Sequence, residues 1–429
     1  VLGAEMKERI AIIDGLRSPI AKANGKLNDV NADTLGAIIT KELILRNNLD
    51  YKEFDEVIMG NVAQPGNTAN IARVMAIKAG FAQSTPAYTV HRNCASGMQS
   101  ISSAIEKIHS NQGDLYLVGG MESMSNIPIL YSDEFRNFIT KFSYSKSFSE
   151  KVKLLSSFRP SFLKPIIGLI SGLTDPISGK IMGITAENLA NEFKISRNEQ
   201  DEYALKSHQK AQKAIENGIF KDEIHQKKKK NASIVQDDGV RFNQTIDALG
   251  KLNPIFEKVG GTVTAGNSSQ VSDGACSLIV CSESKAKELN LEPLGFIKDY
   301  AYAGLDAHRM GLGPIYSTKK LFDKTGIKLE DIDLIEMNEA FAAQIIANLK
   351  AFQSDDFCQK TFNCPALGKI NEEILNVNGG AIALGHPVGM SGARIVLTAL
   401  KELKRRDKKL ALASLCVGGG QGASFLLEI

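Results

Sequence analysis

The stretch His91-Arg92-Asn93-Cys94-Ala95-Ser96-Gly97-Met98-Gln99-Ser100 lies between an expected strand at residues 87–90 and an expected helix. The apolar residues that follow recur at the period of an α-helix, and they are Met98, Ile101, Ile105 and Ile108. The first turns of this helix carry small, uncharged residues, so we expect the helix to be buried. At its N-terminus, the macrodipole and free N–H groups favour a thiolate. Cys94 is therefore a candidate nucleophile, and an inert core cysteine is the alternative.

A second segment of this kind lies near the end of the chain. Residues 391–400 form another expected helix with almost no charge in its first turns, and a strand at 410–417 follows, closed by Gly418-Gly419-Gly420. Superposing Ser96-Gly97 on Ser391-Gly392 also aligns the strands that follow, and residues 57–61 match residues 334–338. Three matching pieces in one order indicate a duplicated α/β unit. The alternation of strands and helices predicts a largely parallel sheet covered by helices.

Length and composition limit the classes of protein to which the chain can belong. Its 429 residues suggest two or three domains, and 51 basic against 48 acidic residues give no reason to expect a nucleic-acid partner. The six cysteines form no C-x-x-C pair, which indicates a reducing compartment and no structural metal. We find no secretion signal and no apolar stretch of membrane-spanning length. We therefore expect a cytoplasmic protein, or a matrix protein if the source has mitochondria.

The middle of the chain differs in character from the two copies. Residues 131–180 combine basic side chains with many phenylalanines, followed by an apolar stretch broken by proline and glycine. Such a segment could lie on a membrane surface or bind a partner subunit. A surface helical hairpin that packs on its own domain is the alternative.

Three further stretches have the composition of loops built for a functional site. They are Asn338-Glu339-Ala340-Phe341-Ala342, residues 376–389 around Gly385-His386-Pro387, and Cys416-Val417-Gly418-Gly419-Gly420-Gln421-Gly422. Ligands of α/β sheets bind at the carboxyl ends of strands, where glycines let backbone N–H groups approach closely. Two cysteines, a histidine and an asparagine would supply a nucleophile, an acid/base and an oxyanion ligand. A lone histidine or a second cysteine is more often structural, so the combination carries the hypothesis.

Taken together, these stretches resemble the thiolase family from about Lys7 to Ile429, and residues 261–269 and 272–275 add to the resemblance. The resemblance implies the α/β thiolase fold, in which two duplicated halves pack in layers (αβαβα) and carry an inserted loop domain. The N-terminal half would be 6–125 with 253–296, and the C-terminal half would be 297–429. The loop domain would be 126–252, with coenzyme A bound to it.

The resemblance also implies roles for individual residues. Cys94 would take the acyl group, His386 would accept its proton and help to hold the thioester oxygen, and Cys416 would be the acid/base for the acetyl-CoA enolate. Asn338 would fix a water in one oxyanion hole, and the N–H groups of Cys94 and Gly418 would form the other.

Three more residues are expected at the substrate. Ser269 resembles a serine that contacts the pantetheine arm, whereas Met182 and Met310 resemble methionines that line the reacting pocket. No metal ligand is expected.

The implied activity is that of a 3-ketoacyl-CoA thiolase with coenzyme A as co-substrate and no bound cofactor, in a homodimer or tetramer. An acetoacetyl-CoA thiolase would share the same reactive residues, and a catalytically silent lipid-binding or scaffold protein is the alternative from another class. The basic insert and residues 354–357 resemble β subunits that assemble with a hydratase/dehydrogenase α subunit. Asn338, however, is typical of stand-alone thiolases, so both assemblies remain open.

Overall fold

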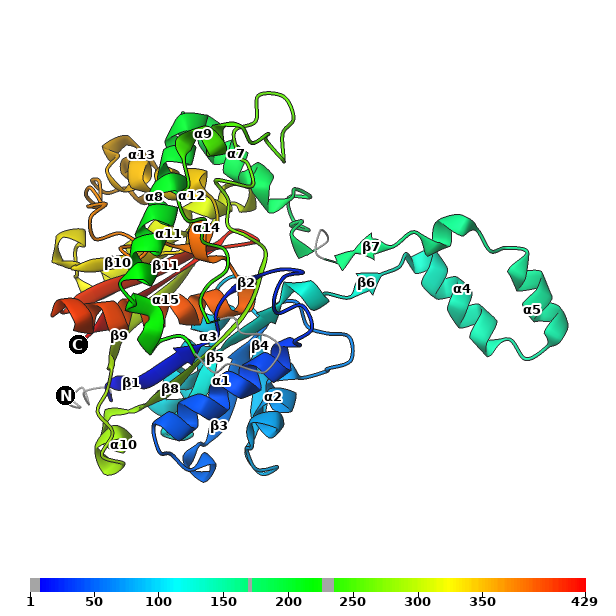
Figure 1. Cartoon of the computed structure of the whole chain (residues 1–429), viewed down its shortest axis with the longest axis horizontal. Helices are drawn as coiled ribbons and strands as arrows, with labels where there is room; N and C mark the ends of the chain where they lie inside the picture. Colours follow the sequence, from blue (N-terminus) through cyan, green and yellow to red (C-terminus); the bar gives the residue numbers. More distant parts are fainter. Residues whose placement is uncertain (1–7, 169–171, 226–234) are drawn as a thin grey trace.

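The computed structural model describes residues 8–168, 172–225 and 235–429 (Figure 1). The main sheet runs in the order β10-β11-β12-β9-β1-β8-β5-β3-β4, and β2 pairs with β8 at its side. The strands of this sheet are β1 (Ile10–Arg17), β2 (Ala21–Lys22), β3 (Glu56–Gly60), β4 (Ala87–Val90), β5 (Leu115–Ser123), β8 (Ser272–Ser282), β9 (Gly295–Gly304), β10 (Leu334–Met337), β11 (Leu410–Val417) and β12 (Gln421–Glu428).

The duplication predicted from the sequence is visible in the strand pairing. In the first half, β3 is parallel to β5, β8 is antiparallel to β5, and β1 is antiparallel to β8. In the second half, β10, β11, β12 and β9 repeat this order and these directions. The halves join where β1 pairs with β9.

The prediction of a largely parallel sheet is wrong, because the main sheet is mixed. Parallel pairs join β3 to β4, β3 to β5 and β10 to β11, and its other strand pairs are antiparallel. The turn between β11 and β12 explains part of this difference. Three glycines, Gly418 to Gly420, separate these strands, and only an antiparallel pair can be joined by so short a loop.

Helices pack on both outer faces and between the halves, which gives the expected five layers. The helices α1 (Ala32–Arg46) and α2 (Ile71–Ala79) cover the first half, and α11 (Gly313–Thr325) and α12 (Ala342–Phe352) cover the second. The central layer is α3 (Ser96–His109) with α15 (Val388–Arg406), whose apolar side chains contact both halves. The remaining short elements are η1 (Tyr51–Glu53), η2 (Met124–Asn126), α10 (Glu283–Glu288), η5 (Ala307–Leu312), η6 (Leu329–Asp331), α13 (Asp355–Phe362) and α14 (Ala381–Leu384).

The two central helices cross at glycines. A Cβ atom on Gly97 would lie 2.5 Å from the backbone nitrogen of Ala393, and one on Gly392 would lie 2.7 Å from that of Met98. Any larger side chain at either position would force the helices apart. The small residues noted at the start of both helices therefore serve close packing.

The chain between β5 and β8 forms the inserted part. Against the body lie α7 (Met182–Glu192), α8 (Arg197–Glu216), η4 (Ile219–Asp222) and α9 (Ile246–Gly250). A two-stranded ribbon, β6 (Ile129–Leu130) and β7 (Ile166–Ile167), leads outward to α4 (Asp133–Tyr144), α5 (Phe148–Leu155) and η3 (Pro160–Leu163). The exact limits of the loop domain, 126–252, stay a prediction.

The segment of residues 129–167, which we name the arm, projects away from the body (Figure 1). No residue of α4, α5 or η3 is buried. Its phenylalanines pack on one another, as in the pairs Phe138–Phe158 and Phe158–Phe162. Residues 169–171 of the predicted segment 131–180 lie outside the described residues. Across the described ranges, no helix has the length and apolarity needed to cross a bilayer.

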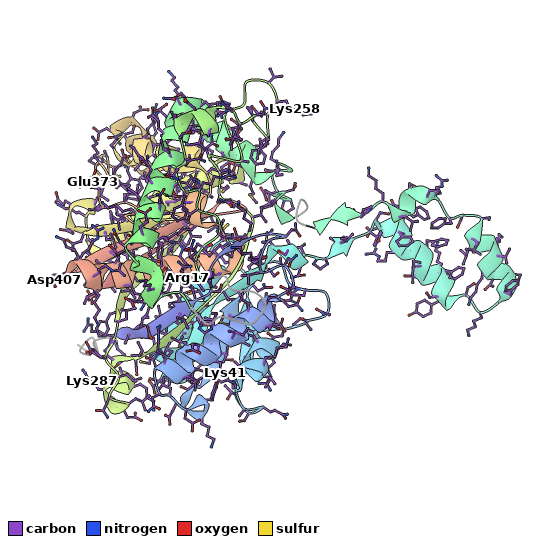
Figure 2. All side chains as sticks on the ribbon, in the orientation of Figure 1. Arg17, Lys41, Lys258, Lys287, Glu373 and Asp407 are labelled. Carbon is purple, nitrogen blue, oxygen red and sulfur yellow. The ribbon has the colours of Figure 1, made fainter. Side chains whose placement is uncertain are left out.

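A buried ion cluster ties β1 to the inserted part. Arg17 is fully buried in the body (Figure 2), where it donates to Glu223 at 2.7 Å and to both carboxylate oxygens of Asp237 at 2.7 and 2.9 Å. The backbone N–H of Ile20 also donates to Asp237, at 2.8 Å. The guanidinium group thus neutralises two carboxylates that water does not reach.

Replacing Arg17 by methionine is expected to lower the free energy of unfolding by about 3–5 kcal/mol, because it leaves buried carboxylates without a counter-ion. Urea titration followed by circular dichroism measures this change. Arg9→Met is the matched control, since Arg9 pairs with Glu428 at a half-exposed site and should cost less than about 1 kcal/mol. Equal losses for the two variants would contradict a special role for the buried cluster.

Candidate active site

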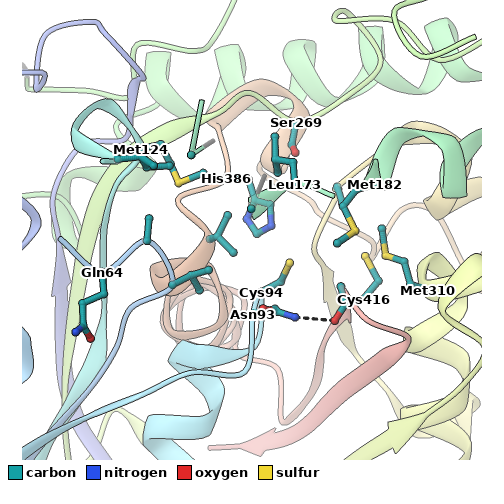
Figure 3. A pocket seen from close by; sticks show the side chains of 18 of the residues that line it. Gln64, Asn93, Cys94, Met124, Leu173, Met182, Ser269, Met310, His386 and Cys416 are labelled. Carbon is teal, nitrogen blue, oxygen red and sulfur yellow. Dashed lines mark hydrogen bonds between the residues drawn. The ribbon is translucent and has the colours of Figure 1, made fainter. Parts of the chain in front are cut away.

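A pocket of about 420 Å³ lies between the two halves (Figure 3). Seven of the eight predicted site residues line it, namely Cys94, Met182, Ser269, Met310, His386, Cys416 and Gly418. The eighth, Asn338, is buried and contacts the ring of His386. The structure therefore brings together residues from seven places that are far apart in the sequence.

Cys94 lies in the tight turn that connects β4 to α3. The N–H groups of Ala95 and Ser96 donate to the carbonyls of Arg92 and Asn93, and Asn93 has a left-handed φ of 43°. The turn directs the sulfur of Cys94 into the pocket, toward the ring of His386 (Figure 3).

The surroundings of Cys94 act on the pKa of its thiol in both directions. Burial raises the pKa of its thiol, whereas the N–H groups of Gly418 and of Cys94 itself lower this pKa in part, and the nearby Glu122 raises it. One of these N–H groups belongs to the nucleophile turn and the other to the turn between β11 and β12, and the loss of hydration outweighs both. These surroundings favour the neutral thiol of Cys94 over the thiolate.

His386 lies in the loop before α15 and lines the same pocket as Cys94. Its Nδ1 lies 2.6 Å from Ser391 Oγ, and this hydroxyl donates to the carbonyl of Pro387 at 2.9 Å. The hydroxyl has one proton, so we assign the hydrogen between them to Nδ1, which leaves Nε2 as an acceptor. Burial, together with the charge of Arg394, lowers the pKa of His386 to about 4. The ring is therefore neutral at physiological pH.

Asn338 follows β10 and lies at the Nε2 edge of this ring. Its backbone N–H donates to the backbone carbonyl of Ser414. Its Nδ2 lies 3.5 Å from His386 Nε2, at the outer limit of a hydrogen bond. Its Oδ1 is buried and has no partner among the described residues. A buried amide oxygen of this kind is a place for a bound water or a polar substrate atom.

Cys416 lies on β11, one residue before the strand ends. It is buried beside Met310 and Ala340, with Met182 and Phe341 packed against them. Burial raises the pKa of its thiol well above the ordinary value, and the nearby Cys94 raises it further. Cys416 therefore rests as a thiol that can donate a proton.

Ser269 is held at the pocket wall because its N–H donates to the carbonyl of Ala340 at 2.9 Å. It also lines an adjoining cavity of about 620 Å³, which reaches Lys22 and Arg241 at the surface. A long polar ligand could enter through this cavity and place its reactive end between the two cysteines.

Sequence reasoning missed Glu122, a buried carboxylate near the end of β5. It accepts hydrogen bonds of 2.9–3.0 Å from the N–H groups of Val62, Ala63 and Gly389 and from the side chain of Asn61. Burial raises its pKa to about 7, and these backbone donors oppose the rise. Glu122 thereby fastens the pocket wall at residues 61–63 to the start of α15. The sequence feature that could have indicated this role is a charged residue inside an otherwise apolar strand.

The other cysteines lie outside this pocket. Burial raises the pKa of Cys276, Cys281 and Cys358, as expected for inert core thiols. Within the described ranges, no three His, Cys, Asp or Glu side chains are grouped so that they could hold a metal ion.

Comparisons with known proteins agree over the whole length of the chain. The family model described as "Thiolase, N-terminal domain" matches residues 10–284, and "Thiolase, C-terminal domain" matches residues 291–429. A 3-ketoacyl-CoA thiolase of Photorhabdus laumondii is 38% identical over 427 residues, which cover 98% of this chain and 97% of the relative. One from Yersinia pestis is 38% identical over 426 residues, with the same coverage.

Solved structures give the same result. An acetyl-CoA acetyltransferase of Bacillus anthracis has a TM-score of 0.86 and 37% identity, and the match covers 99% of this chain and 100% of that one. Human mitochondrial 3-ketoacyl-CoA thiolase in complex with CoA has a TM-score of 0.84 and 35% identity, with 98% of each chain covered. With both family domains matched and the reactive residues gathered in one pocket, the chain belongs to the thiolase family.

Proposed function

We propose that this acyltransferase is a 3-ketoacyl-CoA thiolase, which cleaves a 3-ketoacyl-CoA with coenzyme A into acetyl-CoA and a shortened acyl-CoA. One observation carries the proposal: a single pocket holds two thiols and a neutral imidazole, from Cys94, Cys416 and His386. The names of relatives that match nearly the full length support it. Such a reaction would serve the β-oxidation of fatty acids.

The first half of the proposed reaction forms an acyl-enzyme on Cys94. His386 Nε2 accepts the proton of Cys94, and the thiolate attacks the 3-keto carbon. The bond between C2 and C3 breaks, and its electron pair remains on C2 as the enolate of acetyl-CoA. The thiol of Cys416 gives its proton to C2. Its raised pKa suits this step, because the proton stays in place until the enolate forms.

The second half returns every group to its starting state. Cys416, now a thiolate, accepts the proton of the incoming coenzyme A thiol, whose sulfur attacks the thioester on Cys94. The shortened acyl-CoA leaves, and His386 returns its proton to Cys94. Coenzyme A is thus a co-substrate, and the proposed reaction uses no bound cofactor.

Two groups of donors are proposed to stabilise the oxyanions. The N–H groups of Cys94 and Gly418 face the oxygen on the carbon that is bound to Cys94, and the lowering of the Cys94 pKa by both N–H groups supports this role. His386 and a water held by Asn338 face the thioester oxygen of acetyl-CoA. The unpartnered Oδ1 of Asn338 supports this role, because it leaves an acceptor for that water.

The shape of the pocket favours a medium or long acyl chain over acetoacetyl-CoA. Beyond Met124, its lining includes apolar residues at the root of the arm, such as Pro128 and Leu130, and Leu173 opposite. The short acyl group of acetoacetyl-CoA would leave this apolar lining without a partner. A long acyl chain would bury it, at roughly 25 cal/mol per Å².

All six cysteines are free thiols, which supports a reducing compartment. We therefore propose a cytoplasmic location, or the mitochondrial matrix if the source has mitochondria. The edge strand β4 supports a homodimer, because all four of its residues are half-buried and it ends the strand order of the main sheet. Edge strands pair readily with a second copy.

The arm is proposed to dock on an anionic membrane surface. Residues 131–168 contain seven basic and three acidic residues. Large apolar side chains stand exposed among them, with Tyr144 81% and Phe148 84% accessible. Basic charge combined with apolar side chains is the pattern that binds lipid headgroups and the outer acyl region. Figure 2 shows that the arm and its side chains lie away from the body.

The roles of the two cysteines are separable by mutation. Cys94→Ala is expected to abolish the acyl-enzyme, whereas Cys416→Ala should keep Cys94 acylatable and lower carbon–carbon cleavage by about 10²–10⁴-fold. Mass spectrometry after incubation with acetyl-CoA measures the first effect, and thiolysis assays measure the second. Cys364→Ala, outside the pocket, is the control. A wild-type protein with no acetyl on Cys94, and no selective iodoacetamide labelling there, would instead support the silent lipid-binding or scaffold protein.

Chain-length preference separates the two thiolase activities. We expect a higher kcat/KM for 3-ketohexadecanoyl-CoA than for acetoacetyl-CoA, and we expect Leu130→Asp to lower the former by about tenfold or more, because it places a charge against the acyl chain. Leu163→Asp, on the exposed part of the arm, is the matched control. A preference for acetoacetyl-CoA that Leu130→Asp leaves unchanged would support an acetoacetyl-CoA thiolase.

Membrane docking is tested by flotation with vesicles that do or do not contain phosphatidylserine. We expect binding only to the anionic vesicles, and a loss of about tenfold or more in the double variant Tyr144→Ser/Phe148→Ser, because burial of two aromatic rings is removed. Light scattering of the same samples should show a dimer or tetramer. Absence of vesicle binding, with co-purification of a hydratase/dehydrogenase subunit that the double variant loses, would assign the arm to a protein partner.

A further inference from the structure

One proposed oxyanion donor, the N–H of Gly418, lies in a turn that consists only of glycines. Gly418, Gly419 and Gly420 connect β11 to β12, and the last two have φ values of 84° and 79°. Glycine has the widest conformational freedom of any residue, so such a turn is weakly determined by its own sequence. Catalysis by the Gly418 N–H nevertheless requires a fixed direction, because a donor that reorients loses its advantage over water.

Asn93 supplies a restraint on this turn from the other half of the molecule. Its Nδ2 donates to the carbonyl oxygen of Gly418 at 2.8 Å, which is the contact drawn in Figure 3. The backbone of Asn93 is itself fixed, because the Asn93 carbonyl accepts two hydrogen bonds from Ser96. The N–H of Ser96 donates at 3.0 Å and the Ser96 hydroxyl donates at 2.7 Å. A side chain held in this way can position a partner.

The neighbouring Arg92 holds the other end of the same turn. Its guanidinium donates to Gln421 at 3.1 Å and to Gln99 at 2.6 Å, and it lies 4.2 Å from the centroid of the Tyr302 ring. Gln421 is the first residue of β12. Successive residues of the nucleophile turn therefore hold both ends of the glycine turn.

Gly418 lies between the Met182 side chain and the nucleophile turn. A Cβ atom at Gly418 would lie 2.7 Å from Cε of Met182 and 3.7 Å from Nδ2 of Asn93. The N–H of Gly418 lowers the pKa of the Cys94 thiol, while the Gly418 carbonyl accepts from Asn93 Nδ2. Holding the carbonyl restrains φ and ψ of Gly418, and therefore the direction of the N–H.

We propose that Asn93 is a positioning residue for acyl transfer: its side-chain amide holds Gly418 so that the N–H groups of Gly418 and Cys94 together face the oxyanion on the acyl carbon. This inference rests on the proposed function. It adds a residue that acts through Gly418 and makes no contact with the substrate in the proposed reaction. The nucleophile turn then has two tasks, to present the thiol and to set the oxyanion hole.

The test replaces Asn93 by glycine, which accepts the left-handed backbone and removes the amide. We expect kcat for acetoacetyl-CoA thiolysis to fall by about tenfold, the equivalent of one hydrogen bond, with KM unchanged. Single-turnover acetylation of Cys94 by acetyl-CoA should slow by the same factor. Asn290→Gly is the matched control, because Asn290 has a similar φ of 52° at an exposed turn. It should leave both rates unchanged.

Asn93→Asp provides a second variant of the same size. A carboxylate cannot donate to Gly418 and would repel its carbonyl, so a loss larger than that of Asn93→Gly is expected, again in kcat. Wild-type rates in either variant, or losses confined to KM, would overturn the inference. An unreactive Cys94 in the wild-type protein would overturn the proposed function instead, so the two failures are distinguishable.

Discussion

The close crossing of α3 and α15 is the contact on which the rest of the molecule depends. Because Gly97 and Gly392 let the two backbones touch, the helices can share one layer between the halves. Cys94 lies two residues before the first helix, and His386 lies two residues before the second. Duplication and close packing thereby place the starts of both helices at one pocket, although 292 positions separate Cys94 from His386 in the numbering. The nucleophile and its base meet there.

Burial then decides the charge state of the pocket. A helix N-terminus favours an anion by about 0.3–1 kcal/mol, up to about 2 in the best geometries, whereas full burial can shift a pKa by up to about 3–5 units. The pKa shifts of Cys94, His386 and Cys416 all favour the neutral form. A neutral site admits the uncharged acyl end of a thioester without opposing charges. Charge is then created by proton transfer, when the substrate is present to use it.

The sequence predicted the duplicated halves and the residues of the pocket, although no single motif indicates either. Repetition of a strand, a small-residue helix and a glycine turn disclosed the duplicated halves, and the order of four motifs disclosed the site. Glu122 and Asn93 were not predicted, because their roles depend on backbone groups supplied by distant segments. Strand direction was also misjudged. Alternating strands and helices indicate crossovers, but the antiparallel returns of β8 and β12 leave no such pattern in the sequence.

The position of the insertion links the pocket to the arm. The inserted part leaves the fold after β5 and returns at β8, so its first residues necessarily pass the rim of the pocket. Pro128 and Leu130 belong to the lining, and the ribbon of the arm starts at Ile129. Whatever surface binds the arm is therefore held beside the apolar end of the pocket. Since a long acyl chain is poorly soluble in water, a docking element and an acyl-chain site gain from being built on one ribbon.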